Sequence, residues 1–363
     1  MDKIAEFWNR VERSLFPHLN ECLDEITRKH HELAIVLELI RVEKYVTPSW
    51  MHWRGRPPKD RKALARAFVA KALYNEPTNE SLIEHFRTDA TLRRICGWEK
   101  RSDIPSESTF SRAFTVFAAT SLGDRAHEAC VKEYLGEEVV WHINRDSTGI
   151  SAREKPARKQ ELKSKSKYKR GRPKKGEERP KPEPNRIERQ YAQSYEEAIS
   201  ELPTACDKGT KKDSKGSEHY WVGYKLHVDV GDGGIPISAI TTSASVHDSQ
   251  VAIPLAKMTA GRVESFYDLM DSAYDAKLIR DFSKELGHVP IIDKNARKGK
   301  AEEMEWDRKR RYNNRTTVER FNSQLKDNYG GRMVRVRGKP KVHMHLMFGV
   351  LVIFAQALLN LNG

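Results

Sequence analysis

Cysteine is scarce in this sequence and is never clustered. Among 363 residues there are four cysteines, Cys22, Cys96, Cys130 and Cys206, and no two of them form a C-x-x-C pair. This spacing argues against a zinc site and a disulfide framework, and it is typical of a reducing compartment. Long hydrophobic runs are also missing except at residues 346–359, which are too few to span a bilayer comfortably and predict a closing core helix. The first ten residues contain no apolar signal core.

Acidic residues are fewer than basic residues. The chain has 65 Lys and Arg against 51 Asp and Glu, which gives a net charge of +14. A balance of this kind indicates a polyanionic partner, and it favours nucleic acid over a membrane surface. A chain of this length usually folds as two or more units.

Most of the excess positive charge lies in one segment. Residues 153–190 contain 16 Lys or Arg against 6 Glu and very few apolar side chains, so we expect a disordered insertion at about 153–215. Within it, the stretch from Lys169 to Lys175 contains Gly-Arg-Pro between basic residues and resembles an AT-hook, which enters the minor groove of A·T tracts. The alternative is a solvated basic loop that binds phosphates without sequence preference. Both hypotheses place the same side chains on DNA, namely Arg170, Arg172, Lys174 and Lys175.

Residues 1–135 are predicted to be helical throughout. Apolar residues recur at helical spacing, and polar breaks divide them into short helices. Thr78 or Asn79 and Asp89 are suitable N-caps, and Gly97 is a suitable stop. Short helices joined by tight turns fit a helix-turn-helix module that places one helix in a major groove. They fit a helical dimerisation or packing unit equally well.

From residue 136 the pattern changes to strands rich in β-branched and aromatic residues. The predicted strands are residues 139–146, 219–230, 235–242, 263–271 and 288–292. The first strand is expected to end on Asp146 and to turn at Ser147-Thr-Gly149. An aspartate in this position is often only a turn former, so a catalytic role stands beside a structural one.

Three aspartates near the end of the fourth strand compete for a functional role. Asp268 is inside the strand, Asp271 closes it, and Asp275 follows in the sequence D-S-A-Y-D. A fourth carboxylate, Glu319, lies in the segment from Tyr312 to Lys326. If that segment is one continuous helix, its Tyr, Arg, Glu and Lys fall in a stripe about 60° wide.

Such a stripe is common on a solvated helix face, where Arg315 and Glu319 would form an ordinary surface ion pair. The spacing of Tyr312, Arg315, Glu319 and Lys326, however, matches the Y-R-E-K signature of DDE-type insertion-sequence transposases without substitution. The chain therefore resembles that group, which is insertion sequence 4/5-like. The stretch from Gly55 to Phe110 is similar to the helical N-terminal region of the same group, which is associated with binding the transposon ends.

The resemblance implies an α/β (α+β mixed) protein. A helical N-terminal region, residues 1–135, would bind DNA ends or dimerise. A ribonuclease-H-like catalytic domain, residues 136–363, would hold a mixed five-stranded sheet flanked by helices. The D-S-A-Y-D sequence resembles the second-aspartate motif of the group, whose first Asp is the ligand. The catalytic and metal-binding residues implied in this way are Asp146, Asp271 and Glu319, and those implied to hold phosphates near the cut are Tyr312, Arg315 and Lys326.

The chemistry implied by the resemblance depends on metal ions. In-line attack on a phosphodiester uses two divalent ions, and Mg²⁺ prefers oxygen ligands, so a few carboxylates are enough. Asp146 is expected to bridge the two ions, with Asp271 and Glu319 holding one each, and Mn²⁺ is expected to substitute. His227 and His247 are interpreted as structural, because the carboxylates need neither of them.

The function implied is that of a transposase. It would bind the terminal inverted repeats of its insertion sequence, act as an endonuclease there and transfer the cut strands to target DNA. The expected partner is double-stranded DNA, with a homodimer assembled on it and no membrane. The expected location is the bacterial cytoplasm, associated with the nucleoid. Two alternatives remain: a non-catalytic DNA-binding protein derived from a transposase, and a ribonuclease-H-like nuclease without strand transfer.

Overall fold

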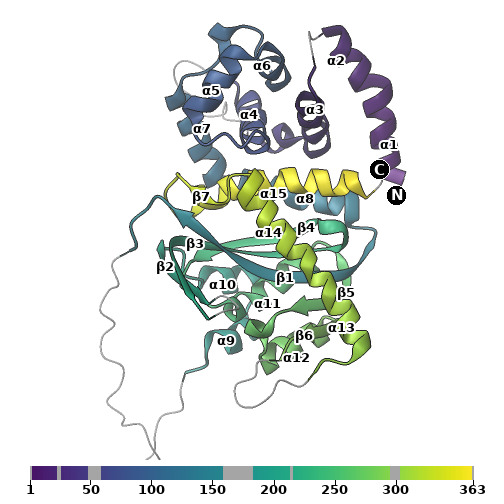
Figure 1. Ribbon diagram of the computed structural model, residues 1–363, viewed down its shortest axis with the longest axis vertical. Coiled ribbons are helices and arrows are strands. Elements are labelled where there is room, and N and C mark those ends of the chain that lie inside the picture. Colours follow the sequence, from purple (N-terminus) through teal and green to yellow (C-terminus); the bar gives the residue numbers. More distant parts are fainter. Residues whose placement is uncertain are drawn as a thin grey trace, which may run out of the picture.

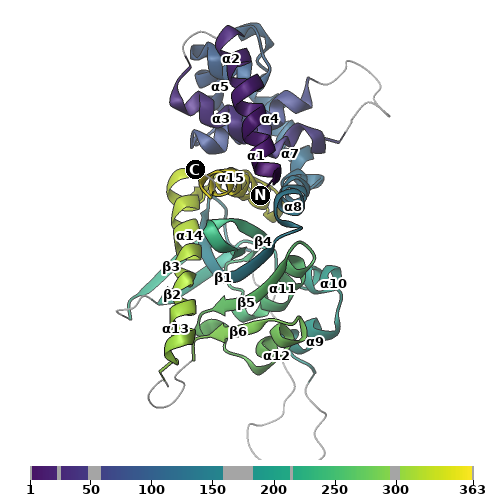
Figure 2. The same cartoon turned by 90° about the vertical axis from the view of Figure 1, so that its right-hand side faces the viewer.

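The computed structural model describes residues 2–22, 26–47, 59–157, 183–212, 216–294 and 303–361. Figure 1 shows a helical region above a twisted sheet, with one long helix between them. Figure 2 shows a helix pair along one face of the sheet and a group of shorter helices on the other. The AT-hook-like stretch and the Gly55 end of the N-terminal resemblance fall outside the described residues.

The helical region is built from eight helices among the described residues. They are α1 (Asp2–Arg10), α2 (Phe16–Cys22), α3 (Arg28–Ile40), α4 (Arg61–Leu73), α5 (Asn79–Thr88), α6 (Ala90–Cys96), α7 (Glu107–Ala119) and α8 (Leu122–Leu135). The Thr78 hydroxyl accepts from Ser81 N at 3.0 Å, and the Asp89 carboxylate accepts from Leu92 N at 2.8 Å. Gly97 follows α6 in the left-handed conformation, with φ at 105°. These helix boundaries are therefore confirmed.

The sheet contains seven strands, and its central order is that of a ribonuclease-H-like fold. The strands are β1 (Val139–Ala152), β2 (Asp207–Lys212), β3 (Glu218–Val230), β4 (Pro236–Ser243), β5 (Glu264–Met270), β6 (Val289–Ile292) and β7 (Met333–Val334). The order β4-β3-β1-β5-β6 is antiparallel from β4 to β1 and parallel from β1 to β6. All five predicted strands are present, and β2 and β7 are additions.

Both faces of the sheet are covered. The covering helices are α9 (Arg186–Ala192), α10 (Tyr195–Ser200), α11 (Ala252–Ala260), α12 (Lys277–Glu285), α13 (Trp306–Tyr312), α14 (Thr316–Asn328) and α15 (Lys339–Asn360). Figure 2 shows α13 and α14 on one face and the α9–α12 group on the other. Side chains that alternate along β1 therefore reach two different environments.

The first strand does not end at Asp146 as predicted. It continues to Ala152, because Ser147–Ser151 pair with β3 and Ser151–Ala152 pair with β7. On its other edge β3 pairs with β2 through Gly223 and with β4 from Tyr224 onward. Gly223 has φ at 153° at this change of partner, and a Cβ there would lie 2.1 Å from the Ile150 carbonyl oxygen. Only glycine allows the strands to approach so closely.

The prediction of disorder through residue 215 is wrong for residues 186–212, which form α9, α10 and β2. Apolar side chains within this stretch explain the order. Ile199 and Leu202 pack in one cluster against α11, and Ile187 and Tyr191 contact a second cluster that contains Phe282. Burial of these side chains holds the end of the insertion on the sheet, although basic residues dominate its composition.

Helix α15 joins the helical region to the sheet. It contacts α4, α7 and α8 on one side and β4 and α14 on the other, and one apolar cluster extends through all of them. It is long and apolar enough to cross a membrane, but 83% of its most apolar window is buried inside the protein. The predicted closing core helix is therefore confirmed by its burial, and Figure 1 shows it between the two regions.

Candidate active site

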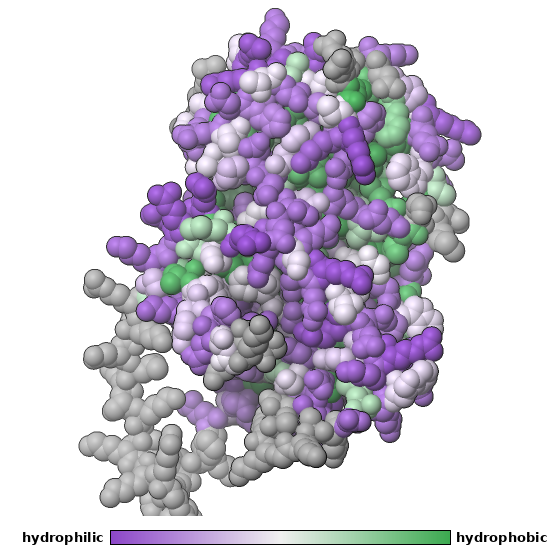
Figure 3. Space-filling view, in the orientation of Figure 1, coloured by the Kyte–Doolittle hydropathy of each residue, from purple (hydrophilic) through white to green (hydrophobic). Residues whose placement is uncertain are grey.

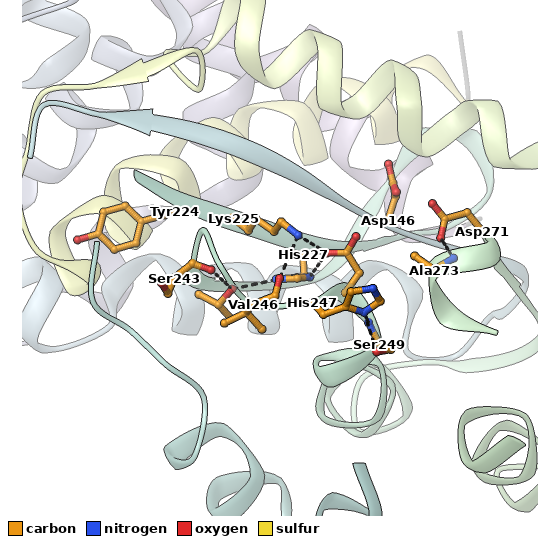
Figure 4. Close-up of polar contacts among 12 residues, drawn as sticks. Asp146, Tyr224, Lys225, His227, Ser243, Val246, His247, Ser249, Asp271 and Ala273 are labelled. Carbon is orange, nitrogen blue, oxygen red and sulfur yellow. Dashed lines mark hydrogen bonds and ion pairs between the residues drawn. The ribbon is translucent and has the colours of Figure 1, made fainter. Parts of the chain in front are cut away.

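The ends of two adjacent strands bring Asp146 and Asp271 together. The last parallel pair between β1 and β5 is Arg145 with Met270, so Asp146 and Asp271 are the next residue on each strand. Beyond this point β5 has ended, and Asp271 accepts a hydrogen bond from Ala273 N at 2.9 Å. Figure 4 shows the two carboxylates directed to the same side, towards the helix that runs above them.

Glu319 reaches this place from the first turn of α14. The segment from Tyr312 to Lys326 is not one continuous α-helix: Tyr312 ends α13, a 3-10 turn occupies Asn313–Arg315, and α14 starts at Thr316. Two consecutive asparagines have low helix propensity, and they coincide with the tighter turn. Arg315 and Glu319 are still one turn apart and face the same way.

The guanidinium of Arg315 lies among all three carboxylates. Its Nη2 atom is 3.1 Å from Asp146 Oδ1 and 3.5 Å from Asp271 Oδ2, and its Nη1 atom is 3.2 Å from Glu319 Oε1. Because Asp146 and Asp271 contact the same nitrogen, their oxygens are separated by no more than the sum of those two distances. Residues 146, 271 and 319, far apart in the sequence, therefore surround one positive charge.

Asn322 is a further side chain of this site that sequence reasoning missed. It lies on the face of α14 that carries Glu319, and its Nδ2 atom donates to Asp146 Oδ2 at 3.0 Å. Its Oδ1 atom is buried and has no hydrogen-bond partner among the described residues. Its position, three residues after Glu319 and seven after Arg315, is a helical spacing that could have identified it.

The electrostatic balance of the site leaves Asp146 short of positive charge. Its side chain is 11% exposed, and burial raises its pKa to about 6, with Asp271 adding to the shift and Arg315 opposing it. Burial lowers the pKa of Arg315, but Asp146 and Asp271 outweigh it and hold that pKa above its ordinary value. One guanidinium therefore only partly compensates three acidic groups.

Two protein-family models match the chain. The chain matches the family model described as "Transposase DDE domain" over residues 142–355, and the one described as "Transposase domain (DUF772)" over residues 21–115. The chain belongs to the DDE transposase family. No curated protein and no solved structure matches it. The matched segment contains Asp146 and most of β1, the end of β5 and the whole of α14.

The donor atoms of this DDE transposase fit a hard divalent metal ion. Carboxylate oxygens from three elements contact one guanidinium, and Asn322, which is hydrogen-bonded to Asp146, has a buried Oδ1 atom with no partner among the described residues. Such oxygens are the ligands of Mg²⁺ and Mn²⁺. In the described part of the chain, no group of three His, Cys, Asp or Glu side chains has a geometry that could hold a metal ion. The cationic Arg315 lies between the three acids.

The two other candidate aspartates of the transposase have different partners. Asp268 is 2% exposed and is held by Ser283 and by His288 Nδ1, the latter at 3.2 Å. Asp275 pairs with Arg280 at 2.8 Å. Asp271, by contrast, shares the Nη2 atom of Arg315 with Asp146.

The two histidines considered above have structural contacts in this transposase. His227 is buried and its Nε2 atom is 2.9 Å from Thr242 Oγ1; burial lowers its pKa to about 4. His247 caps the turn before α11 through Ser249 N at 3.4 Å. Figure 4 shows both with Lys225 in a cluster, while Asp146 and Asp271 point away from it.

The remaining sequence-predicted residues lie around the site or outside the described chain. Tyr312 is half-buried beside Arg315, and burial raises its pKa. Lys326 lines a cavity of about 350 Å³ with Lys211 and Trp221, next to Thr148 and Gly149 of β1. Burial and then Lys211 lower the pKa of Lys326. Sequence reasoning missed Lys211 and Trp221, while the structure does not describe Arg170, Arg172, Lys174 and Lys175.

Proposed function

We propose that this DDE transposase cuts DNA at the ends of its own insertion sequence and joins the cut strands to target DNA. The observation that carries the proposal is the meeting of Asp146, Asp271 and Glu319 around one cation. An ordinary structural ion pair does not need three carboxylates from distant elements. The Tyr312, Arg315, Glu319 and Lys326 spacing supports assignment to the Y-R-E-K group.

Asp146, Asp271 and Glu319 would hold the metal ions of the reaction, with Mg²⁺ as the expected ion. Bound divalent ions supply activation of the attacking oxygen and stabilisation of the leaving oxygen. Asn322 would fix the orientation of the Asp146 carboxylate through its 3.0 Å hydrogen bond. The strand positions of the two aspartates and the helical position of Glu319 provide a rigid frame for this set.

The basic side chains around the carboxylates would hold the substrate. A guanidinium such as that of Arg315 can bind two oxygens of one phosphate, and an ammonium such as that of Lys326 acts as a point charge. Tyr312 completes the group with a hydroxyl donor. Lys211 and Lys326 line one cavity beside β1, so both side chains would contact the same stretch of the DNA backbone.

The two reactions proposed are balanced phosphoryl transfers. In the first, a water oxygen bonds to phosphorus, the bridging P–O bond breaks, and the leaving oxygen takes a proton to become a free 3′-hydroxyl. In the second, that 3′-hydroxyl oxygen loses its proton and bonds to a phosphorus of the target strand, the bond from that phosphorus to the target's own 3′-oxygen breaks, and the leaving oxygen takes a proton to become a 3′-hydroxyl. Neither step requires an oxidant or a reductant.

Pairing of two transposon ends requires at least two protein subunits, so we propose a homodimer assembled on double-stranded DNA. The helical region, residues 1–135, would bind the ends or support the dimer, and residues 136–363 would carry the chemistry. The DNA that the transposase cuts and joins would lie in the bacterial cytoplasm, in the nucleoid.

The proposal is tested by incubating the protein with Mg²⁺ and a labelled duplex that contains the inverted repeats flanking its coding region. We expect nicks that leave 3′-hydroxyls, followed by joined products. Glu319→Gln should abolish cutting and spare binding. Glu264→Gln, a substitution of an exposed glutamate on β5, is the matched control and should cut like the original protein.

The outcomes separate the proposed function from its two alternatives. Binding without any cutting supports a non-catalytic DNA-binding protein, and cutting without joining supports a nuclease. Cutting that survives Glu319→Gln would show that the third carboxylate of the site has been assigned wrongly.

A further inference from the structure

A second polar groove lies at the junction between the helical region and the sheet. It has a volume of about 550 Å³ and lies between α4, α5 and α7 on one side and the segment from β7 to α15 on the other. Buried aromatic rings of Phe68, Phe114 and Phe348 form its floor. None of the residues proposed above to hold metal ions or phosphates lines this groove.

The walls of the groove carry a large excess of positive charge. Five Lys or Arg side chains line it, against one carboxylate, that of Glu107. The five are Lys71 from α4, Arg153 after β1, Arg335 and Arg337 between β7 and α15, and Lys341 in α15. They come from both regions of the molecule. Such convergence of like charges is costly unless a polyanion offsets it.

Most of these cations are available to a ligand. Arg153 and Arg335 are exposed, and within the described residues neither they nor Lys341 pair with a carboxylate. By contrast, Arg332, just before the groove, is paired with Asp327. The Arg337 Nε atom donates to the Arg153 carbonyl oxygen at 3.3 Å, a contact with the backbone that neutralises neither charge.

The groove already affects the ionisation of the groups inside it. The pKa of Lys71 is lowered to about 8, mainly by burial; Glu76 and Glu107 oppose this shift and Arg335 contributes to it. Burial, followed by Lys71, lowers the pKa of His345 to about 4. A negatively charged ligand would raise both pKa values again.

The groove is connected to the active site by β1 itself. Asp146 is in the strand, Thr148, Gly149 and Ser151 line the cavity that holds Lys211 and Lys326, and Arg153 follows the strand in the groove. At about 3.3 Å per residue, Arg153 lies roughly 23 Å from Asp146. That is less than one turn of duplex DNA, which is roughly 34 Å.

We propose that this groove binds the sugar-phosphate backbone of the DNA duplex whose strand is cut, less than one helical turn from the cut. The proposal rests on the proposed function, because it takes DNA as the ligand. Its own support is the convergence of unpaired cations and their alignment with the carboxylates along β1. The groove would thereby fix the helical region and the catalytic residues to one DNA molecule.

The surface around these elements fits a hydrophilic ligand. Figure 3 shows mostly hydrophilic residues on the face that Figure 1 presents, with separate small hydrophobic patches. The core of a protein–protein interface is depleted in charged residues, whereas five cations line this groove. A backbone of closely spaced phosphates needs only the cations, and its binding releases counterions in proportion to the contacts made.

The test measures duplex affinity of the full-length protein at several salt concentrations. Arg335→Gln and Lys341→Gln each remove one cation from the groove, and each should make the slope of log K against log salt shallower by about 0.9. Affinity at 0.1 M salt should fall roughly tenfold for each variant. Lys277→Gln, which removes an exposed lysine on α12, is the matched control and should leave slope and affinity unchanged.

A footprint on the DNA gives a second readout. Hydroxyl-radical cleavage should show a backbone segment, within one turn of the nick, that the original protein protects and that Arg335→Gln exposes. Thermal unfolding of each variant checks its fold, and Arg153→Gln removes a third cation of the groove if either variant is unstable. Unchanged slopes in all three variants overturn the groove proposal.

The failure of this proposal can be told from the failure of the proposed function. If the original protein binds and nicks the duplex but the groove variants behave like Lys277→Gln, only the groove has been assigned wrongly. If the original protein does not bind duplex DNA at all, both proposals fail together.

Discussion

Arg145 and Asp146 are neighbours on β1, yet their side chains lie on opposite faces of the sheet. The charge of Arg145 is balanced by one partner, whereas that of Asp146 is only partly balanced. On one face, Arg145 donates to both oxygens of Asp229, at 2.8 and 2.7 Å, and Thr259 Oγ1 donates to the same carboxylate at 2.7 Å. The side chains of this pair are 2% and 0% exposed. On the other face, Asp146 shares one guanidinium with two more acids.

The difference shows how a stable ion pair and a reactive site can be built from the same residue types. A buried pair whose bonds are all satisfied holds the sheet together and has no capacity for a ligand. A set of acids with too little positive charge costs stability, but it can bind a cation. The structure therefore supports a structural role for Arg145 and Asp229, and it leaves the charge of Asp146 only partly compensated.

The largest expected effect comes from breaking the satisfied pair. Arg145→Met leaves Asp229 buried and unpaired, and the free energy of unfolding should fall by about 3–5 kcal/mol. Chemical denaturation measures this change. The double variant Arg145→Met/Asp229→Leu removes both charges and should recover more than half of the loss. A loss below about 1 kcal/mol in the single variant would mean that the pair is not structural.

The second prediction concerns the unsatisfied face. A pKa of about 6 for Asp146, raised mainly by burial, means that the folded protein binds this proton more tightly than the unfolded chain. Stability from this group is therefore present at low pH and is lost as pH rises from about 4 through 6. Asp146→Asn has no charge to lose, so without metal it should be more stable by about 1–3 kcal/mol at pH 8.

The measurement for Asp146→Asn is the free energy of unfolding from pH 3.5 to 8 in a chelating buffer. The advantage of the variant should shrink as the pH falls and should vanish below about pH 4. Adding Mg²⁺ should stabilise the original protein and leave the variant unchanged. A variant that is less stable at pH 8 would contradict the charge excess at this site.

The third prediction concerns Arg315, whose contacts with the three acids must break before a metal ion can take the same place. Without DNA, Arg315→Gln should bind Mn²⁺ about tenfold more tightly, because roughly 1.4 kcal/mol of competing interaction is removed. Electron paramagnetic resonance of free Mn²⁺ measures the affinity. Arg320→Gln, on an exposed part of α14, is the control and should bind like the original protein.

The smallest expected effect is that of Glu319 on the fold. Its side chain is 58% exposed and its contact with Arg315 is a surface pair, so Glu319→Gln should change the free energy of unfolding by less than about 0.5 kcal/mol. Denaturation of the metal-free protein measures this. A much larger loss would show that Glu319 is a structural residue and that a loss of cutting does not report on chemistry.

Much of the fold could be predicted from local pattern. The caps at Thr78 and Asp89 and the five main strands depend on neighbouring residues, and the structure contains them. The position of Asp271 directly after β5 also follows from local pattern, because a β-branched and aromatic run ends there. Its catalytic role stays a proposal.

The errors have long-range causes. Ser147-Thr-Gly149 has the composition of a turn, but pairing with β3 keeps it extended. The basic composition near residue 187 conceals the few apolar side chains that attach α9 to Phe282. Helical spacing on α14 could have identified Asn322, whereas Lys211 and Trp221 become recognisable as site partners only when distant segments meet. Local periodicity contains no information about these contacts.

The place of α15 has a consequence for synthesis of the protein on the ribosome. This helix follows every other described element in the sequence, yet both the helical region and the sheet bury apolar side chains against it. A nascent chain interrupted before residue 339 would leave both surfaces open to water and prone to aggregation. Production of competent enzyme should therefore depend on ribosomes completing the message. Premature termination of translation would for this reason be a strong way of silencing an insertion sequence that encodes such a protein.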